Sequence, residues 1–127
     1  KVPEIKGAFY PLTILSNVTP GMPAFDEEIF GPVFTVIVAD NNDEAIELAN
    51  RSEFGLGSAI FTSDLEKGEN IAKTELQSGA CFVNDFVKSD PRLPFGGIKM
   101  SGYGRELSDY GMMEFVNIKT IVVKSIV

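Results

Sequence analysis

Three short runs of apolar, β-branched residues, separated by two amphipathic segments, occupy the middle of the chain. Residues 33–39 form a continuous apolar run that predicts a strand buried on both faces, and residues 58–61 and 80–83 predict two further strands. Between them, apolar residues recur at helical spacing over about 43–51 and about 65–76. This order predicts an α/β fold, with a parallel β-α-β-α-β sheet core and right-handed crossovers.

Capping signals predict where the two helices begin and end. Asn42 or Asp43 can cap the first helix. Ser63 and Glu66 have the spacing of an S-x-x-E capping box, which predicts the start of the second helix, and Gly79 is placed to end it.

The two ends of the chain differ from this regular centre. Residues 1–32 are rich in Pro and Gly and predict covering loops, with strand-like content between Phe9 and Val18. A long loop with a glycine-rich centre, residues 94–104, follows Asn84, and residues 105–115 are expected to be helical in part. Residues 120–124 predict a final strand, and an unpaired terminal strand commonly pairs across a subunit interface.

Composition and charge exclude several classes of function. The chain has 127 residues, enough for one domain, and its net charge of −7 argues against nucleic acid or an anionic membrane as a partner. The absence of His excludes a Ser-His-Asp triad, a His–zinc site and His acid–base chemistry within this chain. A single cysteine, Cys81, excludes an internal disulfide and favours a reducing, cytoplasmic compartment. No apolar run approaches a membrane span, and the first residue, Lys1, suggests a chain cut from a longer one.

The glycine-rich stretch does not complete either phosphate-binding pattern. Gly97 and Gly102 have the spacing of a Walker A loop, but Tyr103 and Gly104 stand where Lys and Ser or Thr are required. A dinucleotide fingerprint over Gly102 and Gly104 would need a third glycine at Leu107. A tight turn with unusual backbone angles is therefore the better interpretation.

Cys81 and the acidic residues 26–30 are two further candidates for chemistry, and they lead to different expectations. Cys81 lies in a buried-strand pattern with no His to activate it, so we expect an inert core cysteine, no catalytic residue and no metal site. Residues 26–30 place three carboxylates beside Phe30. They are either a charged loop edge or a site where a carboxylate accepts hydrogen bonds from the two hydroxyls of a ligand diol.

Two segments resemble motifs of the aldehyde dehydrogenase superfamily. Residues 27–33, EEIFGPV, resemble the E-x-F-G-P-V motif, and residues 94–106, PFGGIKMSGYGRE, resemble the P-F-G-G-x-K-x-S-G-x-G-R-E loop. Both occur in the family's order, and the resemblance covers nearly the whole chain. It implies the C-terminal part of the catalytic domain, residues 1–118, followed by an oligomerisation strand, residues 119–127, that pairs in a homo-oligomer.

The resemblance also implies roles for individual residues. Glu28 matches the carboxylate that holds the nicotinamide ribose hydroxyls of NAD or NADP, and Phe30 matches the aromatic beside the nicotinamide. Phe95 matches the aromatic at the mouth of the aldehyde pocket. Ser89 stands where succinate-semialdehyde dehydrogenases place a Ser that binds the distal carboxylate of the substrate, and the nearby Arg92 guanidinium can donate to the same carboxylate. The alternatives are that Ser89 only shapes a turn and that Arg92 points to solvent. Arg105 and Glu106 are expected to brace the glycine-rich loop.

The implied reaction begins with attack of a Cys thiolate on the aldehyde, after which hydride passes to NAD or NADP and water hydrolyses the thioester. The family's catalytic Cys, Glu base, oxyanion Asn and nucleotide-binding domain precede the E-x-F-G-P-V motif. The 127 residues alone are therefore expected to be inactive and to expose apolar surface that the rest of the subunit covers. The alternatives are a stand-alone binding module with this fold and a purely structural oligomerisation unit.

Overall fold

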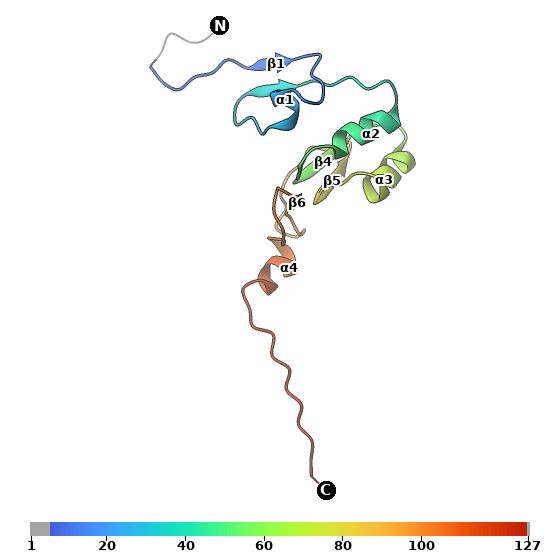
Figure 1. Ribbon diagram of the computed structural model, residues 1–127. Coiled ribbons are helices and arrows are strands. Elements are labelled where there is room, and N and C mark those ends of the chain that lie inside the picture. The colour runs from blue at the N-terminus through green and yellow to red at the C-terminus, as the bar shows by residue number, and fades with distance from the viewer. Residues whose placement is uncertain (1–5, 127) are drawn as a thin grey trace. The chain divides into compact units, whose positions relative to one another are not determined.

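The computed structural model describes residues 6–126. The chain divides into two compact units, with the boundary between Glu53 and Phe54. Each unit is described by itself (Figure 1).

Unit 1 is built on a pair of parallel strands. β1 (Thr13–Leu15) pairs with β2 (Val33–Thr35), with Ile14 opposite Phe34. The short helix α1 (Pro23–Asp26) lies in the connection, where the Thr35 hydroxyl donates a hydrogen bond of 3.2 Å to the Ala24 carbonyl. Helix α2 (Asn42–Asn50) follows β2.

The prediction of a strand over residues 33–39 that is buried on both faces is wrong. Only Val33–Thr35 forms a strand, and the side chain of Phe34 is 60% exposed. A run that is apolar on both faces needs a covering layer on each side. Without such cover in unit 1, the apolar run continues past Thr35 as irregular chain.

Unit 2 contains the predicted parallel β-α-β motif. β4 (Gly57–Ile60) pairs in parallel with β5 (Ala80–Val83), and helix α3 (Leu65–Thr74) makes the crossover and packs against β5. A Cβ on Gly68 of α3 would lie 2.7 Å from Thr62 Cγ2 and 3.0 Å from Val83 Cγ1. The helix therefore needs glycine at this position to approach the sheet closely.

Two smaller elements complete unit 2. β3 (Phe54–Gly55) pairs antiparallel with β6 (Ile98–Lys99), which brings the glycine-rich loop beside the start of β4. Helix α4 (Ser108–Met113) confirms that residues 105–115 are helical in part. The strands thus form separate two-stranded pairs, β1–β2, β3–β6 and β4–β5, of which β3 and β6 were not predicted, and one continuous β-α-β-α-β sheet is not found in the described residues.

The caps lie one or two residues from those predicted. Asn41, and neither Asn42 nor Asp43, caps α2, because its Oδ1 accepts a hydrogen bond of 2.9 Å from the Glu44 N–H. The Glu44 carboxylate in turn accepts from the N–H of Asp40 at 2.6 Å. In a run of capping residues, the pattern alone does not distinguish neighbours, since each can accept the same bond.

Helix α3 is capped by Asp64, whose Oδ1 accepts a hydrogen bond of 3.0 Å from the Lys67 N–H. The S-x-x-E box, which starts one residue earlier, therefore does not cap the helix. The prediction that Gly79 ends the helix is also wrong, since α3 ends at Thr74.

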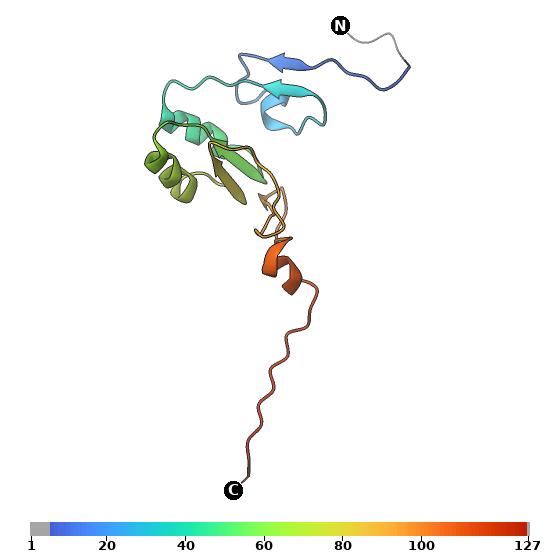
Figure 2. The same ribbon diagram turned by 180° about the vertical axis from the view of Figure 1, so that it is seen from behind.

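The segment after α4 runs away from the rest of unit 2 in both views (Figures 1 and 2). Residues 117–126 form no helix or strand with the part of the chain that the structure describes. Their apolar side chains are exposed, among them Ile118 at 82% and Val123 at 88%. The predicted strand over residues 120–124 is therefore not formed within this chain.

Apolar surface is extensive on both units. Within residues 6–126, Val18 is the one large apolar residue that is buried, whereas Tyr10, Phe34 and Phe61 are each at least 60% exposed. This confirms the expectation of exposed apolar surface, and surface of this kind marks contact with other protein. No helix in the described part of the chain has both the length and the apolar character needed to cross a membrane.

Candidate substrate loop

The loop over residues 84–95, which follows β5, carries the predicted substrate residues Ser89, Arg92 and Phe95. The side-chain amide of Asn84 fixes its start: Oδ1 accepts from the Thr62 N–H and Nδ2 donates to the Thr62 carbonyl, both at 2.8 Å. Asn84 has a φ of 55°, in the left-handed region that asparagine tolerates better than most residues. The Asn84 side chain thus joins the chain just after β5 to the chain just after β4, beyond the ends of the two paired strands.

Two apolar contacts then hold the first half of the loop against β4. The ring centroids of Phe86 and Phe61 lie 5.6 Å apart, a distance typical of paired aromatics. The side chain of Val87 lies over Gly57, where a Cβ would meet Val87 Cγ1 at 2.5 Å. The backbone on either side of these contacts is therefore restrained before the loop reaches Ser89.

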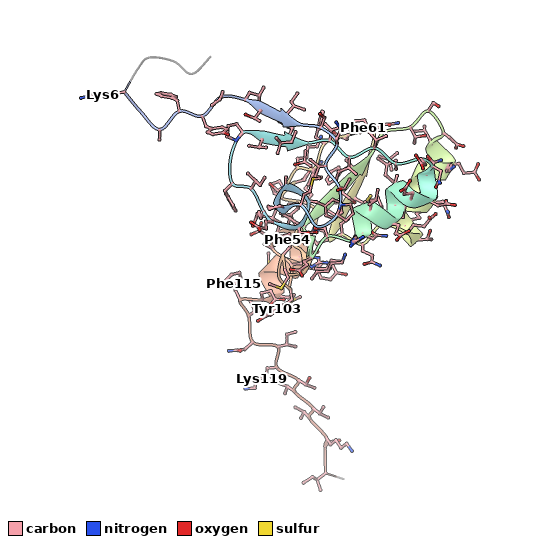
Figure 3. All side chains as sticks on the ribbon, turned by 45° about the horizontal axis from the view of Figure 1, so that its top comes forward. Lys6, Phe54, Phe61, Tyr103, Phe115 and Lys119 are labelled. Carbon is pink, nitrogen blue, oxygen red and sulfur yellow. The ribbon has the colours of Figure 1, made fainter. Side chains whose placement is uncertain are left out.

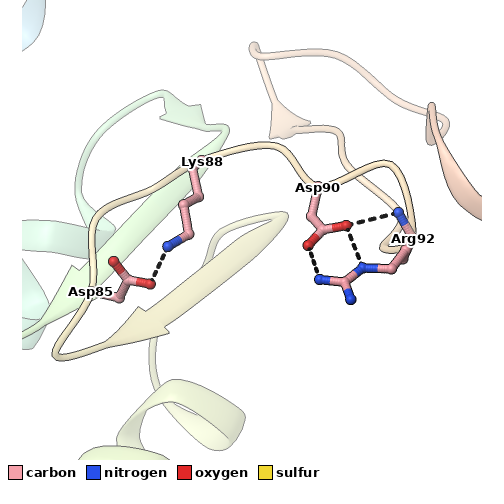
Figure 4. A network of polar contacts seen from close by, with 4 residues as sticks. All are labelled: Asp85, Lys88, Asp90 and Arg92. Carbon is pink, nitrogen blue, oxygen red and sulfur yellow. Dashed lines mark hydrogen bonds and ion pairs between the residues drawn. The ribbon is translucent and has the colours of Figure 1, made fainter.

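Two ion pairs flank Ser89 on the same loop (Figure 4). Lys88 Nζ lies 2.5 Å from Asp85 Oδ2, and Arg92 donates from Nε at 3.0 Å and from Nη2 at 2.6 Å to the Asp90 carboxylate. The backbone N–H of Arg92 also donates to Asp90 Oδ1 at 2.9 Å. Ser89 is exposed between the pairs.

These contacts shift the pKa of three side chains on the loop. Hydrogen bonds from Arg92 hold the pKa of the Asp90 carboxyl well below its usual range, and the same pair raises the pKa of Arg92. The Lys88 ammonium lowers the pKa of Asp85, with help from the Phe86 N–H. Asp85, Asp90 and Arg92 therefore stay charged around neutral pH.

The far end of the loop is joined to the glycine-rich stretch. Phe95 and Glu106 form an antiparallel bridge, with the Phe95 N–H donating at 2.9 Å and the Glu106 N–H donating back at 2.8 Å. Arg105 Nη1 donates to the carbonyls of Gly97 at 2.9 Å and Gly104 at 2.7 Å. The predicted bracing role of Arg105 is confirmed, whereas Glu106 contributes through its backbone bridge to Phe95.

The glycine-rich stretch also packs against the chain that leads into β5. A Cβ on Gly79 would lie 1.7 Å from the carbonyl oxygen of Gly96, a distance that no side chain can occupy. Ser101 Oγ accepts a hydrogen bond of 3.0 Å from the Gly55 N–H on the other side. The glycines here permit close backbone approach, as expected of a structural turn.

A shallow cavity of about 540 Å³, wide open to solvent, lies beside this stretch and is lined by Leu56, Phe95, Tyr103 and Phe115 among others. Tyr103 and Phe115 mark its position in Figure 3. Phe95 is thus the predicted substrate residue that borders a cavity, whereas Ser89 and Arg92 are not among its lining residues.

The predicted cofactor residues belong to unit 1. Glu28 and Phe30 lie in irregular chain between α1 and β2, and both are exposed, Phe30 at 92%. Two tight turns lie here, centred on Phe30 and on Pro32: the Gly31 N–H donates to the Ile29 carbonyl at 3.0 Å, and the Val33 N–H donates to the Gly31 carbonyl at 2.8 Å. An accessible carboxylate beside an open aromatic face fits the ribose diol and nicotinamide end of NAD(P).

Cys81 is half-buried on β5, where it lies opposite Ser58 of β4. The expected fully buried core position of Cys81 is therefore only partly found. Among residues 6–126, no three His, Cys, Asp or Glu side chains converge as metal ligands.

Sequence reasoning assigned no role to Asp85 or Asp90. The signal was present, since an acidic residue stands three residues before Lys88 and another two residues before Arg92. Spacing of this kind is easily overlooked in a loop, because its geometry depends on a turn that periodicity does not reveal.

Comparison with known proteins places this geometry in a family. Residues 2–121 match the model of the aldehyde dehydrogenase family. The chain is 50% identical over 115 residues to the succinate semialdehyde dehydrogenase Sad of Escherichia coli strain K12, a match that covers 91% of this chain and 25% of that relative.

Solved structures agree. A succinic semialdehyde dehydrogenase from Streptococcus pyogenes in complex with NADP+ is 44% identical, with a TM-score of 0.82 over 88% of this chain and 24% of that chain. A betaine aldehyde dehydrogenase from Staphylococcus aureus in complex with NAD+ is 39% identical, with a TM-score of 0.84 over 91% of this chain and 23% of that chain. The chain belongs to the aldehyde dehydrogenase family, and it spans about a quarter of the length of the curated relatives it matches.

Proposed function

We propose that this chain contributes to an NAD(P)-dependent aldehyde dehydrogenase that oxidises succinate semialdehyde to the dicarboxylate. The observation that carries the proposal is the similarity to succinate semialdehyde dehydrogenases across the segment that contains the loop of residues 84–95. That loop presents an exposed Ser89 hydroxyl and an 86% exposed Arg92 side chain. Hydroxyl and guanidinium groups are the donors that a carboxylate requires.

In this proposal, three residues shape the substrate site. Ser89 donates a hydrogen bond from its hydroxyl to the distal carboxylate of the aldehyde, and Arg92 donates a charge-assisted hydrogen bond to the same group. Phe95 forms an apolar wall at the entrance, where it excludes water from the carbon chain of the substrate.

The cofactor side of the proposal rests on Glu28 and Phe30. NAD(P)+, when bound, accepts the hydride of the aldehyde. The Glu28 carboxylate accepts hydrogen bonds from the ribose hydroxyls, and the Phe30 ring packs beside the nicotinamide, which restricts its position.

Glu28→Gln tests this role in the complete protein that carries the chain. The amide keeps one acceptor oxygen and loses the charge, so we expect cofactor affinity or the rate of hydride transfer to fall by about tenfold. Glu27→Gln, one residue earlier and equally exposed, is the matched control and should change neither. Unchanged cofactor affinity and unchanged single-turnover hydride transfer in Glu28→Gln would contradict the assignment.

Assembly and location complete the proposal. Residues 1–118 form part of the catalytic domain, and residues 119–127 pair as a strand with a neighbouring subunit of a homo-oligomer, which would satisfy the open backbone of this segment. We also propose a cytoplasmic location, which the unpaired Cys81 thiol supports. A protein made of these 127 residues alone is expected to have no turnover, because the family's catalytic Cys and nucleotide-binding domain precede the motif at residues 27–33 and are not among them.

The decisive experiment compares aldehydes with the complete protein. Formation of NADH and NADPH is measured with succinate semialdehyde, acetaldehyde and a long apolar aldehyde, beside the intact mass of the gene product. A subunit several times heavier than 13.8 kDa that prefers succinate semialdehyde supports the proposal. A preference for the apolar aldehyde would refute the carboxylate site, and no turnover with any aldehyde would favour a binding module.

A further inference from the structure

Asp90 and Arg92 form a fork whose geometry leaves one edge of the guanidinium open. Asp90 accepts through both carboxylate oxygens from Nε and Nη2, which is the side edge of the guanidinium. One N–H of Nη1 and the second N–H of Nη2 form the other edge. Figure 4 shows Nη1 on the side of the guanidinium away from Asp90. The Arg92 side chain is 86% exposed, so this edge is accessible to a ligand.

The carboxylate of Asp90 is held more firmly than that of an ordinary surface residue. Its side chain is only 28% exposed, and Oδ1 also accepts from the backbone N–H of Arg92. The Leu93 N–H donates to the Asp90 carbonyl at 2.9 Å, and the Ser108 N–H donates to the Pro91 carbonyl at 3.0 Å. Hydrogen bonds thus hold the turn at both ends. The Asp90 carboxylate in turn restricts the long Arg92 side chain, which would otherwise sample many rotamers.

We propose that Asp90 is a positioning residue for substrate specificity, which holds the Arg92 guanidinium so that its Nη1/Nη2 edge receives the distal carboxylate of the aldehyde. The inference rests on the proposed function, since it concerns the carboxylate end of that substrate. A guanidinium has two edges that can each bind a carboxylate with two parallel hydrogen bonds, so Asp90 and substrate occupy different edges and do not compete.

Simple charge arguments predict the opposite effect for Asp90. A negative side chain beside an anionic substrate repels it, so removal of the charge alone would improve binding. If Asp90 acts by orientation, its removal weakens binding in spite of that gain. Weaker substrate binding after removal of the Asp90 charge therefore indicates that Asp90 orients Arg92, whereas stronger binding indicates that Asp90 only repels the substrate.

The test uses the complete protein, with kcat/KM measured for succinate semialdehyde and for pentanal, an uncharged aldehyde of similar length. Asp90→Asn is expected to lower kcat/KM for succinate semialdehyde about tenfold, the value of a charge-assisted hydrogen bond, and to leave pentanal within about twofold. Asp85→Asn is the matched control, because it removes the same charge from the same loop while Asn keeps an acceptor for the Phe86 N–H. It should change neither substrate by more than about twofold.

A double-mutant cycle identifies the route of the effect. If Asp90 acts through Arg92, Asp90→Asn has no further effect on succinate semialdehyde in an Arg92→Ala background. Additive losses, equal losses for both aldehydes, or an improvement with succinate semialdehyde would each overturn the positioning role. A wild-type protein with no preference for succinate semialdehyde refutes the proposed function and this inference with it. A wild-type preference that Asp90→Asn leaves unchanged refutes the inference alone.

Discussion

The amide of Asn84 gives the most quantitative prediction, because one side chain makes both contacts at the start of the substrate loop. Asn84→Gly removes the two hydrogen bonds of 2.8 Å to Thr62 but keeps a residue that tolerates the φ of 55°. Each bond is exposed, so we assign each the low end of the usual range, about 0.5 kcal/mol. Local opening of the loop should therefore become about 1 kcal/mol easier.

Asn84→Ala separates the backbone from the hydrogen bonds. Alanine loses the same two bonds and also adopts the left-handed region at a cost of about 1 kcal/mol, for a total of about 2 kcal/mol. Because 1.4 kcal/mol corresponds to a factor of ten, protection should fall about fivefold in Asn84→Gly and about thirtyfold in Asn84→Ala.

Native-state hydrogen exchange of the Thr62 amide measures this directly, since Asn84 Oδ1 is the acceptor of that N–H. Exchange of a peptide over about residues 60–64 would be followed by mass spectrometry in the complete protein. Equal protection in wild type and Asn84→Gly would refute the role of the amide. Equal protection in the Gly and Ala variants would refute the backbone argument.

Three further predictions concern the same region. Gly79→Ala places a Cβ 1.7 Å from a backbone oxygen and should destabilise the protein by about 2 kcal/mol or more in thermal unfolding, whereas Gly31→Ala, with nothing within 4 Å, should change little. Arg105→Ala removes the donor to two loop carbonyls, so limited proteolysis should cut the glycine-rich stretch about tenfold faster, and an unchanged rate would argue against bracing. Because Arg92 lowers the pKa of Asp90, the fork is fully formed above the ordinary Asp value of about 4 and is lost only as the pH falls through the lowered pKa. The ratio of kcat/KM for succinate semialdehyde and pentanal should therefore be constant from about pH 5 to about pH 8, and a transition near pH 6 would contradict this.

Local patterns predicted several elements well. The β4-α3-β5 unit followed from two apolar runs and a helical repeat, and its parallel pairing is as expected. The partly helical segment after Arg105 was also predicted correctly. These features depend on neighbours along the chain, which is the information that periodicity contains.

Caps and strand partners were predicted less well. Asn41 and Asp64 cap their helices one or two residues away from the predicted positions, because several adjacent side chains can accept the same backbone N–H. β2 pairs with β1 instead of joining β4 and β5, since partner choice depends on surfaces that one strand's sequence does not specify.

The amino-acid sequence by itself determined the family, through two short motifs. The roles of Glu28, Phe30, Ser89 and Phe95 stay predictions that follow from the resemblance. The tertiary structure decided how the substrate loop is held. The Asn84 clamp, the fork of Asp90 and the backbone bridge at Phe95 each join groups whose contact depends on turn geometry and on close backbone approach. Those contacts form only when the chain closes on itself, and no periodic pattern of apolar and polar residues encodes them.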